Sequence, residues 1–146
     1  MKITIGRVDK ADFPELSLSD IDVKIDSGAY TSSIHCSNIE EFVIDNERFI
    51  RFKLLDPEHV FYNNKEFSTK KYTFKKVKSS NGISEKRFLI ETEIVIFNES
   101  FLIHLTLSER KEMKFPILLG RKFLNKKFVI DTTKKNLSHK LKYKLK

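Results

Sequence analysis

Alternating hydrophobic and polar residues run through most of this chain and predict β-strands. Side chains of a strand point alternately to its two faces, so a strand with one buried face shows a two-residue period. The runs with this pattern are "KITIGRV" (2–8), "FPELSLSDIDVKID" (13–26), "SSIHCSNIEEFVI" (32–44), "RFIRFKLLD" (48–56), "KYTFKKVKSS" (71–80), "ISEKRFLIETEIVIFN" (83–98) and "FLIHLTL" (101–107).

Turn residues separate these runs. Asn81-Gly82 lies between two of them, and such a pair is a strong hairpin signal because both turn residues of a type I′ turn need positive φ. Pro14 and Asp56-Pro57 mark further turns. Only "GRKFLNKK" (120–127) has the pattern of a short helix. With 146 residues, 40% of them hydrophobic, the chain is predicted to form one small all-β domain.

One predicted strand ends abruptly. In "VKIDSGAYTSSIH" (23–35), the alternating pattern stops at Asp26-Ser27-Gly28. These residue types are common in turns, so the triplet alone is weak evidence for a function. A second stretch adds to it. In "FPILLGRKFL" (115–124), an apolar strand ends at a glycine and leads into the predicted helix.

Together the two stretches resemble the retropepsin-like aspartic proteases. In that family, a strand ending in Asp-Thr/Ser-Gly-Ala lies beside a strand that ends in two apolar residues and a glycine and is followed by a helix. The counterparts here are Asp26-Ser27-Gly28-Ala29 and Leu118-Leu119-Gly120-Arg121, and the Asn81-Gly82 hairpin falls where the family has its flap. The chain is most similar to a bacterial and archaeal branch labelled ATP-dependent zinc proteases, through "KIDSGAYTSSIH", "KSSNGISEKRFLIET", "IHLTLSERKEMKFPILLGRKFL" and "FVIDTTKK".

This resemblance implies an all-β fold: a retropepsin-like (acid protease) closed barrel with a β-hairpin flap and one short helix. It covers nearly the whole chain, so we expect a single retropepsin-like domain over residues 1–133. Residues 134–146 hold six lysines and no acid, and they are expected to form a basic C-terminal tail. Such a tail is compatible with disorder and with extension of the sheet of a dimer.

The resemblance also implies a reaction, in which two carboxylates share one proton around a water and hydrolyse a peptide bond. The ionised carboxylate takes a proton from the attacking water, and the protonated one donates to the carbonyl oxygen. This chain has one Asp-Ser-Gly and is too short for a second lobe. The second carboxylate is therefore expected from another copy, in a two-fold homodimer. The expected catalytic residues are Asp26, Ser27 and Gly28.

Neighbouring residues receive roles from the same resemblance. Ser27 is expected to hydrogen-bond across the dimer, and Gly28 lets its amide approach a carboxylate closely. The expected substrate-binding residues are Ala29 and the flap tip, Ser79, Ser80, Asn81 and Gly82. Many viral relatives have an acid directly after the alanine, paired with the arginine of the second motif. Tyr30 replaces that acid here, so Arg121 is expected to be structural, with its partner left open.

The formal net charge is +8, and two segments supply most of it. One is the tail, and the other is residues 70–87, with seven basic residues and one acid. Ordinary solvated lysines account for this charge equally well, but around a shared cleft it would favour an acidic peptide. Members of the branch are associated with ATP-grasp ligases that add glutamate to ribosomal protein tails. We therefore expect a peptide or protein substrate with acidic, glutamate-rich tails.

No cofactor and no metal are expected. The sequence has no Gly-rich loop ending in Gly-Lys-Ser/Thr and no His-Glu-x-x-His, and its histidines and Cys36 have no recognised ligand spacing. A single cysteine allows no internal disulfide, and no apolar run reaches the roughly 20 residues that span a bilayer. These features predict a cytoplasmic protein without membrane contact.

Two other functions remain open. Tyr72 and Phe74 alternate with lysines in "KKYTFKKVK" (70–78), a pattern compatible with a basic nucleic-acid-binding module. The other alternative is a catalytically silent dimeric interaction domain. The intact Asp-Ser-Gly favours the peptidase over both.

Overall fold

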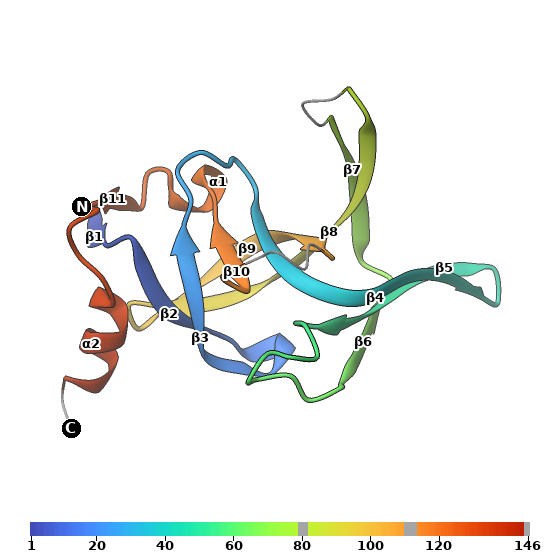
Figure 1. Cartoon of the computed structure of the whole chain (residues 1–146), viewed down its shortest axis with the longest axis horizontal. Coiled ribbons are helices and arrows are strands. Elements are labelled where there is room, and N and C mark those ends of the chain that lie inside the picture. The colour runs from blue at the N-terminus through green and yellow to red at the C-terminus, as the bar shows by residue number, and fades with distance from the viewer. Residues whose placement is uncertain (79–81, 110–113, 145–146) are drawn as a thin grey trace.

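The computed structural model describes residues 1–78, 82–109 and 114–144. Its strands are β1 (Ile3–Ile5), β2 (Val8–Phe13), β3 (Leu18–Ile25), β4 (Ser32–Ile44), β5 (Glu47–Leu54), β6 (Glu66–Thr69), β7 (Tyr72–Lys78), β8 (Ser84–Ile96), β9 (Glu99–Ser108), β10 (Ile117–Leu119) and β11 (Phe128–Ile130). Its helices are the short 3-10 helix η1 (Pro14–Leu16), α1 (Arg121–Leu124) and α2 (Leu137–Tyr143). The predicted predominance of strands is confirmed (Figure 1).

Most predicted strands lie where the two-residue period places them. The run 32–44 is β4 over its full length, and the turn predicted at Pro14 is η1. The run 2–8 forms β1 and the start of β2, because the chain bends at Arg7. At Gly6, a Cβ atom would lie 2.3 Å from the carbonyl oxygen of Lys134, so this position needs a glycine. The single predicted helix is α1, but the prediction was incomplete because α2 forms in the segment expected to be a tail.

Part of the large sheet forms a ring of paired strands. The order in the ring is β10-β3-β2-β8-β9-β4, and β4 pairs in turn with β10. Outside the ring, β5 and β6 continue from β4, and β7 pairs with β8. Strand β10 is parallel to β3 and antiparallel to β4, so it closes the ring between the strands that flank residues 26–31. β2 joins β8 through one register pair, Asp12 with Val95. The predicted closed barrel is thus present as a ring of paired strands and not as a regular barrel.

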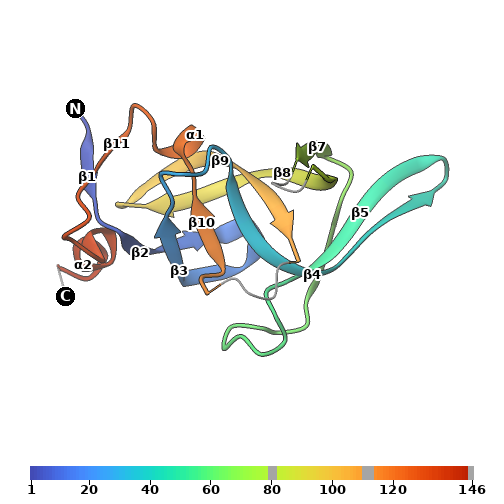
Figure 2. The same cartoon turned by 45° about the horizontal axis from the view of Figure 1, so that its top comes forward.

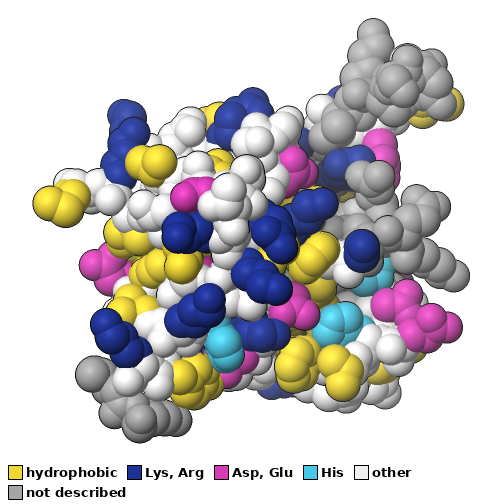
Figure 3. All heavy atoms as spheres, turned by 60° about the vertical axis from the view of Figure 1, so that its left-hand side comes forward, with side chains coloured by type: hydrophobic (Ala, Val, Ile, Leu, Met, Phe, Trp, Pro, Cys, Tyr) yellow, Lys and Arg dark blue, Asp and Glu magenta, His cyan; other side chains and the backbone are white. Residues whose placement is uncertain are grey.

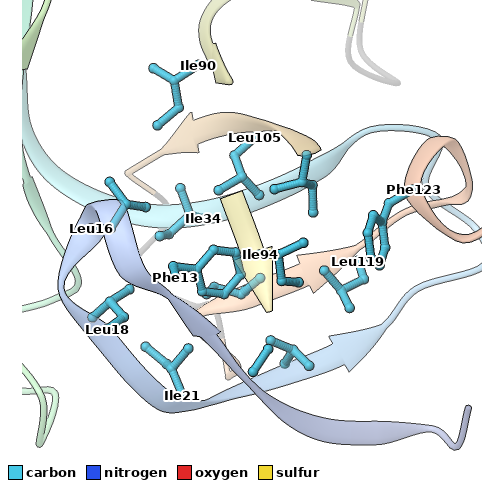
Figure 4. Close-up of a cluster of buried hydrophobic side chains, with 14 of the residues drawn as sticks. Phe13, Leu16, Leu18, Ile21, Ile34, Ile90, Ile94, Leu105, Leu119 and Phe123 are labelled. Carbon is cyan, nitrogen blue, oxygen red and sulfur yellow. The ribbon is translucent and has the colours of Figure 1, made fainter. Parts of the chain in front are cut away.

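A hydrophobic core fills this ring and fixes the positions of β3 and β10. Figure 4 shows its side chains pointing toward one another from the strands of the ring, from η1 and from α1: Phe13, Leu16, Leu18, Ile21, Ile34, Ile90, Ile94, Leu105, Leu119 and Phe123. Phe13, Ile94 and Leu119 are fully buried. Each buried side chain of this size stabilises the fold by about 1.5–3 kcal/mol, so the place where β3 ends is firmly held.

Two hairpins extend beyond the core. The β7–β8 hairpin and the β4–β5 hairpin project from the body in different directions (Figures 1 and 2). Phe42 and Phe49 stack across the β4–β5 hairpin, with ring centroids 5.2 Å apart. Glu41 on β4 links the two hairpins, because its carboxylate accepts hydrogen bonds from the Tyr72 hydroxyl at 2.8 Å and the Lys86 ammonium at 3.2 Å.

Helix α2 is held on β2 by a buried carboxylate. Asp9 is 1% exposed, and its oxygens accept hydrogen bonds from the backbone N–H groups of Ser138 and His139 at 2.8 and 3.1 Å. Lys142 at the other end of the helix reaches Asp12 at 3.0 Å. Part of the lysine-rich C-terminal segment is therefore an ordered helix against the sheet.

Charged side chains of both signs share the surface. Figure 3 shows Lys and Arg side chains mixed with Asp and Glu on the face that it presents. Within the described residues, no helix is long and apolar enough to cross a membrane.

Candidate active site

Asp26 lies directly after β3, at the edge where two parallel strands end. Leu119, the last residue of β10, is the register partner of Ile25. The Leu119 carbonyl accepts a hydrogen bond of 2.9 Å from the Asp26 N–H. The two sequence motifs predicted to lie side by side are therefore adjacent in space. Figure 2 shows the loop after β3 close to α1, which follows β10.

A tight turn follows Asp26 and leaves its neighbours open to solvent. The Gly28 N–H donates to Asp26 Oδ1 at 3.1 Å, and the Ala29 N–H donates to the Asp26 carbonyl at 3.2 Å. Asp26 and Ala29 are half-buried, whereas Ser27 and Gly28 are exposed. The turn thus presents a carboxylate, a hydroxyl and a bare backbone at one surface.

The start of α1 supports this turn through backbone hydrogen bonds. The Arg121 and Lys122 N–H groups donate to the carbonyls of Ala29 and Tyr30, both at 2.8 Å. Gly120 makes this approach possible, because a Cβ atom there would lie 2.6 Å from the Tyr30 carbonyl oxygen. The glycine of the second motif is therefore required by its contact with the loop of the first.

The sequence left the partner of Arg121 open, and the structure places Arg121 against the loop that follows Asp26. Its guanidinium donates to the Ser27 carbonyl at 2.8 Å, and it lies 5.8 Å from the centroid of the Tyr30 ring. A cation within about 6 Å of an aromatic ring is attracted by the negative face of the ring. Tyr30 thus replaces an acid as the partner of this arginine.

The β7–β8 hairpin approaches the same loop. Lys75 on β7 donates from its ammonium to the Thr31 hydroxyl at 2.9 Å, and it lies 5.9 Å from the Tyr30 ring centroid. Gly82 has φ +85, as the predicted turn requires. Ser79, Ser80 and Asn81, predicted to contact substrate, lie outside the described residues.

Several cations in and directly before the hairpin are neutralised by nearby acids. Lys70 pairs with Glu47, and Lys86 pairs with Glu41. Arg87 lies 3.4 Å from a carboxylate on its own strand. The positive charge of residues 70–87 is therefore smaller at the protein surface than the sequence indicates.

Glu41 and Cys36 are titratable groups whose pKa values depart from the ordinary range. Hydrogen bonds from Tyr72 and then Lys86 lower the pKa of Glu41, which remains charged at neutral pH. Burial, and then the charge of Glu109, raises the pKa of the Cys36 thiol. A buried protonated thiol is a small apolar group without nucleophilic character.

The histidines and the cysteine lie apart from Asp26. His35 is beside Asp56 at 3.7 Å, and His104 pairs with Glu91 at 3.0 Å. In the part of the chain that the structure describes, no three His, Cys, Asp or Glu side chains are arranged to hold a metal ion.

Sequence reasoning missed two residues of this site. Ser32 is 1% exposed, and its hydroxyl accepts a hydrogen bond from the Gly120 N–H at 2.9 Å, which joins β4 to the second motif. Thr31 meets Lys75, as described above. Both stand in the quoted stretch 23–35, but their partners are more than forty residues away, so no local pattern indicates their roles.

Comparison with known proteins places the chain in a family. A profile for the retropepsin-like aspartic endopeptidase RimB, described as RimB-like, matches residues 4–141. A probable alpha-L-glutamate ligase of Shewanella pealeana is 35% identical over 134 residues, and one of Desulfotalea psychrophila is 37% identical over 134 residues. Each match covers 89% of this chain but 28% of the relative. The chain thus spans just over a quarter of the length of these relatives.

A solved structure has the same fold. A Legionella pneumophila protein of unknown function matches with a TM-score of 0.67 at 22% sequence identity, over 94% of this chain and 99% of that one. At this identity the likeness concerns the fold alone. Since the family profile covers nearly all of the sequence, the chain belongs to the RimB-like family of retropepsin-like aspartic endopeptidases.

Proposed function

We propose that this protein is a homodimeric aspartic endopeptidase in which Asp26 of each subunit activates water to hydrolyse peptide bonds. The observation that carries the proposal is the position of Asp26. It follows β3 and is continued by an exposed Ser-Gly turn, and residues of β10 and α1 form hydrogen bonds with the backbone of this turn. The family to which the chain belongs supports the same reaction.

In the proposed reaction, one carboxyl group acts as the general base and the other as the general acid. The ionised Asp26 takes a proton from a water held between the subunits, and the partner subunit's Asp26, protonated, donates to the oxygen of the scissile carbonyl. The water oxygen attacks the carbonyl carbon, and the amine leaves with a proton. Two carboxyl groups about 3 Å apart repel when both are ionised, so one proton is shared between them.

The dimer supplies what one chain lacks. The sequence has one Asp-Ser-Gly, and a two-fold axis through the turn would bring two copies of Asp26 together. Ser27 and Gly28 are exposed in the single chain, which is where a partner would cover them. The β7–β8 hairpin would act as the flap, offering backbone groups to an extended peptide.

The proposed substrate is an acidic peptide, such as a glutamate-rich protein tail. Two relatives are named probable alpha-L-glutamate ligase, and this chain matches 28% of each. A hydrolase domain joined to such a ligase would act on a product that carries glutamate. The cationic hairpin beside the candidate site supports an acidic substrate on independent grounds.

The two alternative functions, a nucleic-acid-binding module and a catalytically silent interaction domain, receive less support. Tyr72, proposed as a base-stacking residue, has its hydroxyl bonded to Glu41 and its ring packed edge-on against Phe88 at 5.7 Å. A nucleic-acid base would have to displace these contacts. The intact Asp-Ser-Gly turn with its full backbone support is more than a silent interaction domain needs.

Asp26→Asn tests the proposal. It removes the proton acceptor but keeps the size of the side chain, so hydrolysis of a poly-glutamate peptide is expected to fall by about 10²–10⁴-fold. The wild-type chain is expected to cleave this peptide faster than a neutral one, by a margin that salt reduces. Undiminished hydrolysis by the variant, at unchanged thermal stability, would contradict the proposal.

A further inference from the structure

Lys75 differs from Lys86 and Arg87, the cations of its hairpin that pair with acids, because its own partners are neutral. Its ammonium donates to the Thr31 hydroxyl and lies over the Tyr30 ring, and both partners are neutral. Among the described residues, no carboxylate forms an ion pair with it. Lys86 on β8 and Lys70, which precedes β7, are in contrast paired with Glu41 and Glu47.

Arg121 is a second cation with neutral partners at the same place. It binds the Ser27 carbonyl and the Tyr30 ring, and none of the described carboxylates forms an ion pair with it. Two unneutralised cations thus share one aromatic ring, 5.9 and 5.8 Å from its centroid. Like charges held near each other create a positive potential that favours an anion.

This positive site adjoins the candidate catalytic turn. Tyr30 and Thr31 follow Asp26 by four and five residues, and the turn that starts at Asp26 folds back through the Ala29 N–H. Tyr30 is 52% exposed, so its ring is accessible. An extended peptide advances about 3.3 Å per residue, so side chains flanking a bond held at Asp26 can reach this ring.

We propose that Lys75 is a specificity-determining residue that binds a carboxylate side chain of the substrate beside the scissile bond, with Tyr30 and Arg121 completing the subsite. This inference rests on the proposed function and names the residue through which that function selects its substrate. In the free chain, Thr31 and Tyr30 hold the lysine in place.

Among the side chains of a peptide substrate, the exchange of partners is favourable for a carboxylate. A hydrogen bond from an ammonium to a carboxylate is stronger than one to a neutral hydroxyl. A glutamine side chain would replace one neutral partner by another and gain little. Because Lys75 belongs to β7, binding of the carboxylate also fixes the flap over the catalytic turn.

The test measures binding, so that it does not depend on turnover. All chains carry Asp26→Asn, and the probe is a fluorescein-labelled glutamate-rich peptide compared with its glutamine counterpart by fluorescence anisotropy. We expect Lys75→Met to reduce the preference for the glutamate peptide by about tenfold or more, as for the loss of a charged hydrogen bond. Lys75→Arg should restore most of the preference, because it keeps the charge.

Lys76→Met is the matched control. It removes the same charge from the same strand, but neighbouring residues of a strand point to opposite faces, so it should leave the preference intact. If both variants lost the preference for the glutamate peptide equally, the preference would come from the overall positive charge of the hairpin, and the inference would be overturned. An unchanged preference in Lys75→Met, or no preference in the parent chain, would overturn it as well. None of these outcomes decides whether Asp26 is catalytic, which the hydrolysis assay measures separately.

Discussion

Asp26 is positioned by backbone groups, and this leaves its side chain available for chemistry. The Asp26 N–H is bound to Leu119 and the Asp26 carbonyl to the Ala29 N–H. Among the described residues, the Gly28 N–H is the donor to the Asp26 carboxylate, at Oδ1. The remaining lone pairs can therefore meet a water and a second carboxyl group, which is what the proposed reaction needs.

At Gly28, the stability of one chain and the activity of the proposed dimer can be tested separately. A Cβ atom at this position would lie 3.4 Å from Asp26 Oδ1, an ordinary contact, and its φ is not in the left-handed region. Gly28→Ala is therefore expected to change the unfolding free energy by less than about 1 kcal/mol. Peptide hydrolysis should nevertheless fall at least about tenfold, because a partner or substrate would meet the new methyl group.

Urea unfolding and a peptidase assay on the same preparation measure both effects. Gly120→Ala is the contrasting variant. Its Cβ atom would lie 2.6 Å from the Tyr30 carbonyl oxygen, so it should lose stability as well as activity. Full activity of Gly28→Ala would argue that nothing closes over this turn.

The sequence alone was sufficient to find the residues of the two motifs but not the contacts between their side chains. Asp26 and Gly120 stand in short contiguous patterns that end strands, and such patterns are readable locally. The contacts of Arg121 with Ser27 and of Lys75 with Thr31 join residues 94 and 44 positions apart. They depend on how the ring of strands closes, which no local pattern contains.

At the scale of elements, the β4–β5 hairpin braces the flap candidate. Glu41 on β4 binds Tyr72 on β7 and Lys86 on β8, so one carboxylate holds both strands of the β7–β8 hairpin. Tyr72 lies at the base of the hairpin, and Lys86 lies opposite Lys76, closer to its tip. Lys75 adds a contact with Thr31, beside the candidate catalytic turn, so the hairpin is held at several points along its length.

This brace is expected to weaken in acid. Hydrogen bonds from Tyr72 and then Lys86 lower the pKa of Glu41 in the folded chain. Its stabilisation is complete above the unfolded-state value of about 4.3 and is lost as the pH falls through the lower folded value. Amide hydrogen exchange in β7 should therefore speed up below about pH 4 in the wild type relative to neighbouring strands.

Glu41→Gln provides the comparison. The variant lacks the titrating carboxylate, so its β7 amides should already exchange faster at neutral pH and should show no additional loss in acid. The same exchange rates in both chains at pH 7 would show that Glu41 does not hold the hairpin.

Helix α2 depends on Asp9. The buried carboxylate accepts the N–H groups of Ser138 and His139, and its removal leaves these donors without a partner. Asp9→Ala is expected to destabilise the fold by about 2–3 kcal/mol. Asp22→Ala, which removes a surface partner of Lys10 at 2.6 Å, should cost less than about 1 kcal/mol. Urea denaturation of the two variants makes the comparison, and equal losses would contradict the assigned role.

Elements with a regular period were predictable, and α2 was not. The run that became β4 alternates cleanly at its start, and its strand has the predicted bounds. The segment 134–146 consists of lysines with scattered apolar residues, a composition that favours no packed helix by itself. Its order comes from Asp9, on the second strand of the fold, and thus from tertiary contacts that outweigh local composition.

At the scale of the whole molecule, the proposed enzyme has half of its acid pair in each subunit. Mixing wild-type chain with an excess of Asp26→Asn chain should therefore reduce activity below that of the wild type alone, because mixed dimers hold one carboxylate. Specific activity should also fall on dilution as dimers dissociate. Activity that stays constant in both titrations would contradict a shared site.

The long stretch of chain between β3 and β10 has a consequence for biosynthesis. The loop that carries Asp26 receives support from residues 119–122, and the Arg121 contact with Ser27 spans 94 positions. Bringing together such distant segments is slow and must await their synthesis. During synthesis, the turn at Asp26 therefore cannot reach its supported geometry before residues 119–122 have been made. In the proposed dimer, the need for two such copies to meet would postpone peptide hydrolysis further, which would protect other proteins near the site of translation.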